Sequence, residues 1–101
     1  VPAPELRAPM LRTRDSRLAA LIDACYPSAS RRLAEEGRVV VVVHIDATGR
    51  IGAWNIVQSS GFSRLDAAVH CVARRLEFVP ARRDDTALAE SARLPIVFRL
   101  D

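Results

Sequence analysis

The side chains that most often carry metal or catalytic chemistry are few and scattered in this sequence. Its two histidines, His44 and His70, do not stand with cysteines or carboxylates at ligand spacing, whereas a metal site needs three or four converging ligands. The hydroxyls of Ser59 and Ser60 precede Gly61 but lack the Gly-x-Ser-x-Gly surroundings of a hydrolase nucleophile. We therefore expect no metal, no cofactor and no enzymatic activity.

Neighbouring carboxylates occur at Glu35-Glu36 and at Asp84-Asp85. Both pairs stand in segments that read as loop or helix surface, so solvated charge explains them better than a pair of catalytic acids does. The glycines, at positions 37, 49, 52 and 61, match no phosphate-binding spacing. The polar residues therefore favour a binding module over an enzyme.

The positive charge is dispersed along the chain. All fifteen basic residues are arginine, they are interleaved with twelve Asp and Glu residues, and the net charge is +3. Recognition of nucleic acid by its phosphates needs clustered cations, ideally beside stacking aromatic rings. We expect an arginine-rich solvated surface and no nucleic acid partner.

The remaining reactive side chains are Cys25 and Cys71. An even count suits one disulfide in an oxidising compartment, although buried free cysteines are also common, so the spacing leaves both states open.

With 101 residues the chain fits a single domain. It begins at Val1 rather than Met, and even an apolar run such as Val39 to Val43, which no other run exceeds, is far shorter than a membrane span. We expect it to be a fragment whose leader or membrane anchor lies upstream.

Three helices are predicted. Residues 1–13 contain Pro2, Pro4 and Pro9 and read as an extended lead-in, and residues 14–101 form the domain. Asp15 or Ser16 begins a short helix that runs to Ala24 and ends before Pro27. The other two helices span residues 29–36, with Gly37 as the stop, and residues 64–76.

Three strands complete the prediction. Residues 38–46 and 51–58 form an antiparallel hairpin, with a bulge near Gly52 where the alternation changes phase. Residues 81–91 read as a polar connection, and residues 94–100 form the last strand. The fold class is α+β: a two-layer domain with a three-stranded antiparallel sheet, two helices on one face and a short N-terminal helix.

The predicted sheet leaves surfaces that need an explanation. Its outer strands have unpaired backbone edges, which are templates for an added strand. If Val39, Val41, Val43 and Ile45 face the helices, then Val40, Val42 and Val57 form an apolar patch on the opposite face. We favour the N-terminal helix as the cover of this patch over a dimer partner or another protein.

Seven short motifs, in order and with consistent spacing over residues 26–101, resemble the TonB C-terminal domain family. They are Tyr26-Pro27-Ser28-Ala29-Ser30-Arg31-Arg32, Glu36-Gly37-Arg38-Val39-Val40-Val41, Asp46-Ala47-Thr48-Gly49-Arg50-Ile51, Ser59-Ser60-Gly61-Phe62, Leu65-Asp66-Ala67-Ala68, Arg74-Arg75-Leu76-Glu77-Phe78-Val79-Pro80-Ala81-Arg82 and Leu94-Pro95-Ile96-Val97-Phe98-Arg99-Leu100.

The resemblance implies a periplasmic domain of an energy transducer that is tethered to the inner membrane by an upstream segment. There ExbB and ExbD supply energy from the proton-motive force. Such a domain grips the TonB box of an outer-membrane transporter, which adds as a strand beside the last strand of the domain and so drives uptake. The alternative is a TonB-like adaptor that binds another envelope protein, or that forms a homodimer, without transducing energy.

Carried over to this chain, the resemblance places the partner-binding edge at the last strand, with Val97 and Arg99 best placed to meet the box. The full set of expected partner-binding residues is Asp23, Tyr26, Pro27, Leu94, Pro95, Ile96, Val97, Phe98, Arg99 and Leu100. Some relatives pair a cysteine before the Tyr-Pro motif with one on the second helix of the family, which favours a disulfide between Cys25 and Cys71.

Overall fold

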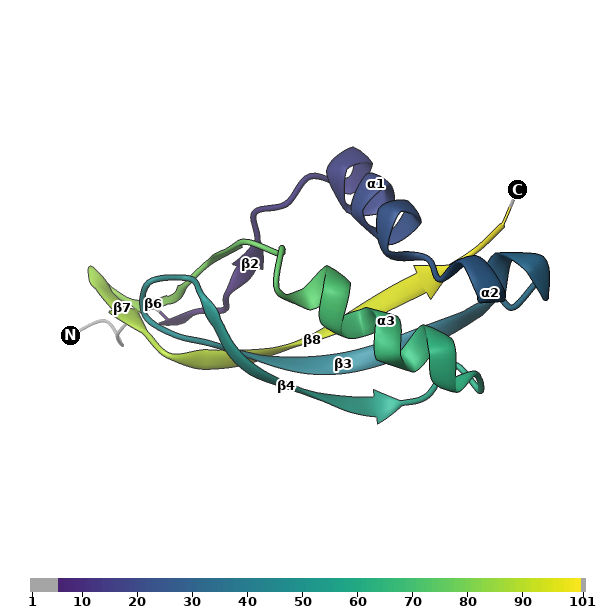
Figure 1. The fold of residues 1–101 in the computed structure, drawn as a ribbon. Coiled ribbons are helices and arrows are strands. Elements are labelled where there is room, and N and C mark those ends of the chain that lie inside the picture. The colour runs from purple at the N-terminus through teal and green to yellow at the C-terminus, as the bar shows by residue number, and fades with distance from the viewer. Residues whose placement is uncertain (1–5, 101) are drawn as a thin grey trace.

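The structure, a computed structural model, describes residues 6–100 (Figure 1). Part of the predicted lead-in, residues 1–5, lies outside the described residues. The helices are α1 (Asp15–Cys25), α2 (Ser28–Arg32) and α3 (Ser63–Ala73). The strands are β1 (Leu6–Arg7), β2 (Met10–Leu11), β3 (Gly37–Ile45), β4 (Ile51–Gln58), β5 (Phe78–Val79), β6 (Ala81–Arg83), β7 (Thr86–Leu88) and β8 (Glu90–Phe98). Within residues 6–100, no helix combines the length and the apolar character needed to cross a membrane.

The predicted three-stranded antiparallel sheet is present, in the order β4-β3-β8. Valine at alternate positions of the central strand faces the helices, and Val39, Val41 and Val43 are completely buried there. Strand β3 keeps an unbroken register with β8, from Gly37 opposite Phe98 to Ile45 opposite Glu90. Burying the β-branched stripe on one face therefore fixes the register of both neighbours.

The predicted bulge at Gly52 is confirmed. The pairing of β3 with β4 passes from His44 opposite Ala53 to Ile45 opposite Ile51, which leaves Gly52 without a partner residue. A second register shift, between Val40 and Val41, was not predicted.

The inner face of the sheet is covered by α3 and α1. Helix α3 buries Leu65, Val69 and Val72 completely against the sheet. Its first turn is tied down by Asp66, whose carboxylate accepts hydrogen bonds from both serine hydroxyls and one backbone N–H of the preceding Ser59-Ser60 turn. Burial acts to raise the pKa of Asp66, but these hydrogen bonds outweigh it and hold the pKa below its ordinary value.

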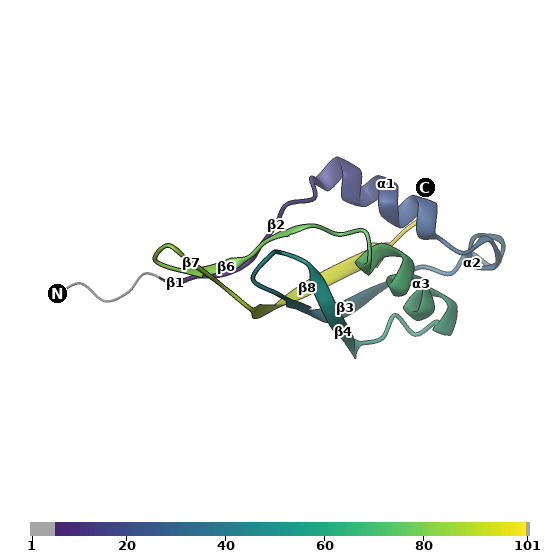
Figure 2. The ribbon, with the colours of Figure 1, turned by 60° about the vertical axis from the view of Figure 1, so that its left-hand side comes forward.

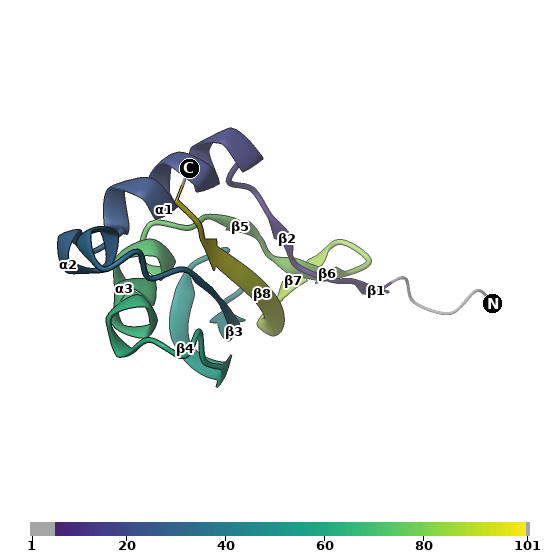
Figure 3. The same ribbon diagram turned by 90° about the vertical axis from the view of Figure 1, so that its right-hand side faces the viewer.

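Helix α1 does not cover the outer face of the sheet, so that prediction is wrong. It lies on the same side as α3, as Figures 2 and 3 show. Leu18, Leu21 and Ile22 pack against the shared core, and Cys25 is bonded to Cys71 of α3. The apolar stripe of α1 could pair with either face of the sheet, and this cross-link places it on the inner face.

Helix α2 is shorter than predicted and does not stop at Gly37. It ends at Arg32, and Ala34 takes a left-handed conformation with a φ of 55°. Gly37 instead begins β3. A side chain at that position would place its Cβ 2.8 Å from the Cβ of Ser60, so the close approach of two backbones requires glycine there.

Residues 81–91 are not a polar connection. They contain the hairpin β6-β7, which turns at Asp84 with a φ of 52°, and β8 begins at Glu90 rather than at Leu94. The lead-in joins this region: β1 pairs with β6, and β2 pairs with β5. Arg82-Arg83 and Asp84-Asp85 follow one another in this segment, so it has no apolar alternation from which strands could be predicted.

Candidate functional site: the free edge of β8

Strand β8 is an edge strand of the central sheet. Its inner side pairs with β3, and within residues 6–100 no strand pairs with its outer side. The N-terminal strands do not occupy that side, because β1 pairs with β6 and β2 pairs with β5. The backbone of β8 therefore keeps donors and acceptors free for a further strand.

The side chains of β8 divide into a core set and an outer set. Ile96 and Phe98 are completely or almost completely buried, and Leu94 packs against the same core. Pro95 and Val97 face the other side of the sheet, and Val97 is 41% exposed. The side chains of Ile96 and Phe98 are therefore closed to a partner, whereas Val97 can offer its side chain.

Tyr26 anchors the chain next to the end of β8. Its ring packs edge-on against Phe98, with 5.4 Å between the ring centroids, and its hydroxyl donates a hydrogen bond to the Glu35 carbonyl. Burial is the main reason why the pKa of the Tyr26 phenol lies above its usual value. The guanidinium of Arg31 covers the ring at 4.8 Å from the centroid. Pro27 follows directly and is the N-cap residue of α2.

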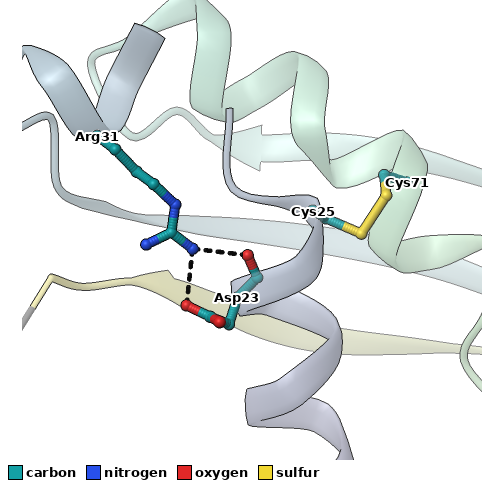
Figure 4. The surroundings of a disulfide bond; sticks show 4 residues. All are labelled: Asp23, Cys25, Arg31 and Cys71. Carbon is teal, nitrogen blue, oxygen red and sulfur yellow. Dashed lines mark hydrogen bonds and ion pairs between the residues drawn. A yellow bond between two sulfur atoms is a disulfide. The ribbon is translucent and has the colours of Figure 1, made fainter. Parts of the chain in front are cut away.

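Asp23 lies on α1 and is held by Arg31 (Figure 4). Nη2 of Arg31 donates to the Asp23 carboxylate at 2.7 Å and to the Asp23 backbone carbonyl at 2.8 Å. Two residues later, Cys25 is bonded to Cys71, with 5.7 Å between the Cα atoms. The last turn of α1 is therefore fixed from two sides.

A groove of about 450 Å³ brings some of the predicted residues together and adds others. Asp23 and Tyr26 line it with Val97 and Arg99, whereas the other predicted partner-binding residues do not. The wall contributed by Ala19, Ala20 and Ile22 was not predicted from the sequence. Exposed alanines on a short helix carry no chemical signal, so these positions could be found only after α1 was placed.

The chain matches the family described as Gram-negative bacterial TonB protein C-terminal over residues 24–100. It belongs to the TonB C-terminal family. Protein tonB2 of Pseudomonas aeruginosa is 37% identical over 76 residues, which cover 75% of this chain and 28% of that protein. Protein TonB of Xanthomonas campestris is 30% identical over 75% of this chain and 34% of its own length. Protein TonB of Vibrio cholerae is 27% identical over 92% of this chain and 38% of its own length. The chain thus spans about a third of the length of these relatives.

The family match begins at Ala24, near the end of α1. It includes the Tyr-Pro corner and all of β8, but it leaves out Ala19, Ala20 and Ile22 of the groove. The β8 edge therefore belongs to the part of the chain that this TonB family match covers, and the whole α1 wall, Asp23 included, lies outside it.

The two histidines of this TonB domain remain apart from each other and from the β8 groove. Nδ1 of His44 lies 2.7 Å from the Ser91 hydroxyl on the outer face of the sheet, and His70 packs its ring against Trp54. Among residues 6–100 there is no group of three or more His, Cys, Asp or Glu side chains placed to hold a metal ion.

Proposed function

We propose that this chain is the periplasmic, partner-binding domain of a TonB-type energy transducer. It grips the TonB box of an outer-membrane transporter by accepting the box as an additional strand on the outer side of β8. A membrane-anchored upstream segment connects it to ExbB and ExbD, so that the proton-motive force drives uptake.

The observation that carries this proposal is the free edge of β8 in a chain of the TonB C-terminal family. Backbone hydrogen bonds along a strand edge grip peptides of varied sequence, and the alternate side chains add selectivity. The edge lies beside Asp23 and Tyr26, which line the adjoining groove and were predicted to meet the box. We propose that the predicted residues outside the groove, which are Pro27 and the remaining β8 residues, contact the guest strand through their backbone or shape this corner of the domain.

The test is titration of the ¹⁵N-labelled domain with a TonB-box peptide, followed by NMR. We expect amide shifts concentrated at residues 94–100. Two peptides N-methylated at every second residue, in opposite phases, then test the mode of binding, because an added strand uses the N–H groups of only alternate residues for pairing. One phase should abolish binding and the other should retain it. Absence of shifts at millimolar peptide, or equal loss in both phases, would contradict strand addition.

A second role is favoured by the uncovered outer face of the sheet. Val40 is already buried there, at 6% exposed, but Val97 is 41% exposed on that face, and Val57, at the neighbouring register shift of β4, is 49% exposed. A homodimer or adaptor interface would bury them. Sedimentation equilibrium distinguishes the two roles: a tight dimer that excludes the peptide supports the adaptor, and a monomer that binds the peptide supports the transducer.

A further inference from the structure

Three arginines that are far apart in the sequence line one cavity of the folded domain. Arg12 follows β2, Arg50 precedes β4, and Arg74 follows α3. All three belong to the wall of a cavity of about 500 Å³. The turn between β3 and β4 and the C-terminal end of α3 lie toward the same end of the sheet (Figure 1). The fold therefore gathers positive charges that the sequence disperses.

The cavity is separate from the groove beside β8, and no described residue lines both. Gly37 lies opposite Phe98, next to the groove, whereas Ile45 at the other end of β3 leads into the turn that lines the cavity. At about 3.3 Å per residue, these two ends of β3 are about 26 Å apart. A ligand in the cavity therefore leaves the β8 edge open, and an inference about this cavity does not depend on the proposed function.

Backbone contacts fix the three segments that carry the arginines. The N–H of Arg12 donates to the carbonyl of Glu77 at 2.7 Å. The carboxylate of Asp46 accepts a hydrogen bond from the N–H of Arg50 at 3.0 Å. The N–H of Arg74 continues the hydrogen bonding of α3. The backbone around the cavity is thus ordered before a ligand arrives, which lowers the entropy cost of binding.

The wall of the cavity carries an excess of two positive charges. Among residues 6–100, none of the three guanidinium groups forms an ion pair or a hydrogen bond with another residue. Of the described residues in the wall, Glu77 alone is acidic. Asp46 also attracts Arg50, but its carboxylate is bonded to the turn and does not line the cavity. Like charges around a hollow attract a counter-ion into it.

The end of α3 does not cancel this attraction. The C-terminal end of a helix has a partial negative charge, which comes from carbonyls without a hydrogen-bond donor and opposes the binding of an anion. Here the last carbonyls of α3 accept hydrogen bonds from the N–H groups of residues 74–76. The field in the cavity is therefore set mainly by the arginines.

The remainder of the wall is largely apolar. It includes Ile51, Trp54, Leu76 and Phe78. Trp54 is only partly buried, and His70 contacts its ring edge-on at 5.1 Å between the ring centroids. An exposed part of an indole ring favours stacking with another ring or with an apolar group. The cavity thus combines a cationic part with an aromatic part.

A phosphate monoester on a ring matches both parts. Its charge of about −1.5 to −2 at pH 7 balances the excess in the wall, and its three terminal oxygens accept several hydrogen bonds. Guanidinium groups bind such oxygens in a bidentate geometry. A single carboxylate would neutralise only half of the excess charge.

We propose that this cavity is a binding site for a phosphate monoester attached to an aromatic or sugar ring. Arg12, Arg50 and Arg74 bind the phosphate, and Trp54 contacts the ring. A soluble compound and a lipid headgroup both offer this chemistry, and the experiment distinguishes these two sources.

The experiment titrates the domain with phenyl phosphate at constant ionic strength. Trp54 is the single tryptophan of the chain, so its fluorescence and its indole N–H signal in NMR report on this cavity. We expect a saturable change in both signals, with amide shifts in residues 48–54 and 74–78. Shifts confined to residues 94–100, or the absence of saturable binding both here and to the vesicles described below, overturn the proposal.

The role of the arginines is tested with Arg74→Gln. Arg75→Gln is the matched control, because Arg75 is the next residue, is also exposed and does not line the cavity. We expect about ten-fold weaker binding by Arg74→Gln, which loses charge-assisted hydrogen bonds, and a change of less than about two-fold for Arg75→Gln. Equal weakening by both variants would show general attraction to a basic surface and overturn the site. Circular dichroism confirms that each variant is folded.

The opposing charge gives a test in the other direction. Glu77→Gln removes the carboxylate in the wall and keeps the backbone carbonyl that holds Arg12, so we expect phenyl phosphate to bind several-fold more tightly. Glu36→Gln, at an exposed position outside the cavity, should leave the affinity unchanged. Weaker or unchanged binding by Glu77→Gln overturns the assigned charge balance.

Two further ligands examine the ring and the source of the phosphate. Inorganic phosphate should bind more weakly than phenyl phosphate, and equal affinities overturn the role of Trp54. Vesicles of phosphatidylcholine containing phosphatidic acid present a phosphate monoester on a lipid. Binding to them that is lost in Arg74→Gln supports the site with a lipid source, whereas binding of phenyl phosphate alone supports it with a soluble source.

Discussion

Removing the Cys25–Cys71 disulfide is expected to lower the free energy of unfolding by about 2–4 kcal/mol. The bond joins residues separated by 46 positions. In the chain-entropy treatment, closing a loop of that length removes about 13.5 cal/mol/K from the unfolded chain, or about 4 kcal/mol at 25 °C. Residual structure in the unfolded chain reduces the gain, so 4 kcal/mol is the upper bound. The loss corresponds to a decrease in Tm of about 10–20 °C for a domain of this size.

The assay is urea unfolding of the oxidised wild type, the reduced wild type and the double variant Cys25→Ala/Cys71→Ala. The reduced protein keeps both sulfur atoms, so its difference from the oxidised protein reports the cross-link alone. The double variant adds a packing loss of about 1 kcal/mol, because Cys25 is buried. A decrease of less than about 1 kcal/mol on reduction, with an unchanged denaturant slope, would refute the argument that the bond acts on the unfolded chain.

Three further predictions concern stability. Gly49→Ala should lower the free energy of unfolding by about 2 kcal/mol or more, because Gly49 has a φ of 89° and a Cβ there would lie 2.2 Å from the carbonyl oxygen of Phe78. Gly61 has a φ of 92° but open space around it, so Gly61→Ala should lower the free energy of unfolding by about 1 kcal/mol in the same urea assay. Tyr26→Phe should cost about 1–3 kcal/mol, because it leaves a buried carbonyl without its donor, and a loss near zero would contradict this. The pKa of Asp66 lies below its ordinary value of 3.8 in the native state. Ionised Asp66 therefore stabilises the fold fully above pH 3.8, and this stabilisation is lost as the pH falls through the native pKa. Unfolding measured from pH 6 to pH 2 should therefore show a smaller acid-dependent decrease in Asp66→Asn than in the wild type, and parallel curves would count against it.

The central sheet was predictable because its physical signal is strong and local. The valines from Val39 to Val43 are β-branched and alternate between a buried face and an outer face, which fixes strand, register and core together. The bulge at Gly52 could be predicted because the alternation changes phase there. The free edge of β8 followed from the same pattern, since a three-stranded sheet must leave two edges.

The hairpin β6-β7 and the position of α1 could not be predicted in the same way. Arg82 and Arg83 offer no apolar alternation, and their pairing is set by the turn at Asp84 and by the lead-in that docks beside them. For α1, the stripe of Leu18, Leu21 and Ile22 fits an apolar surface on either side of the sheet. Only a long-range constraint decides between the two sides, and here that constraint is the bond to Cys71.

The position of α1 also decides the shape of the surface beside the β8 edge. The backbone of an edge strand is the same for every sequence, so hydrogen bonding along β8 gives affinity with little discrimination. Discrimination needs a surface that the side chains of the guest strand must meet. On the outer face of the sheet, α1 would have left both sides of the β8 edge open. On the inner face, held by Cys25 and Tyr26, it stands over the last residues of β8 and turns an open edge into a groove with one closed side. The contacts that anchor α1 to the core are therefore the same contacts that shape the groove beside the edge.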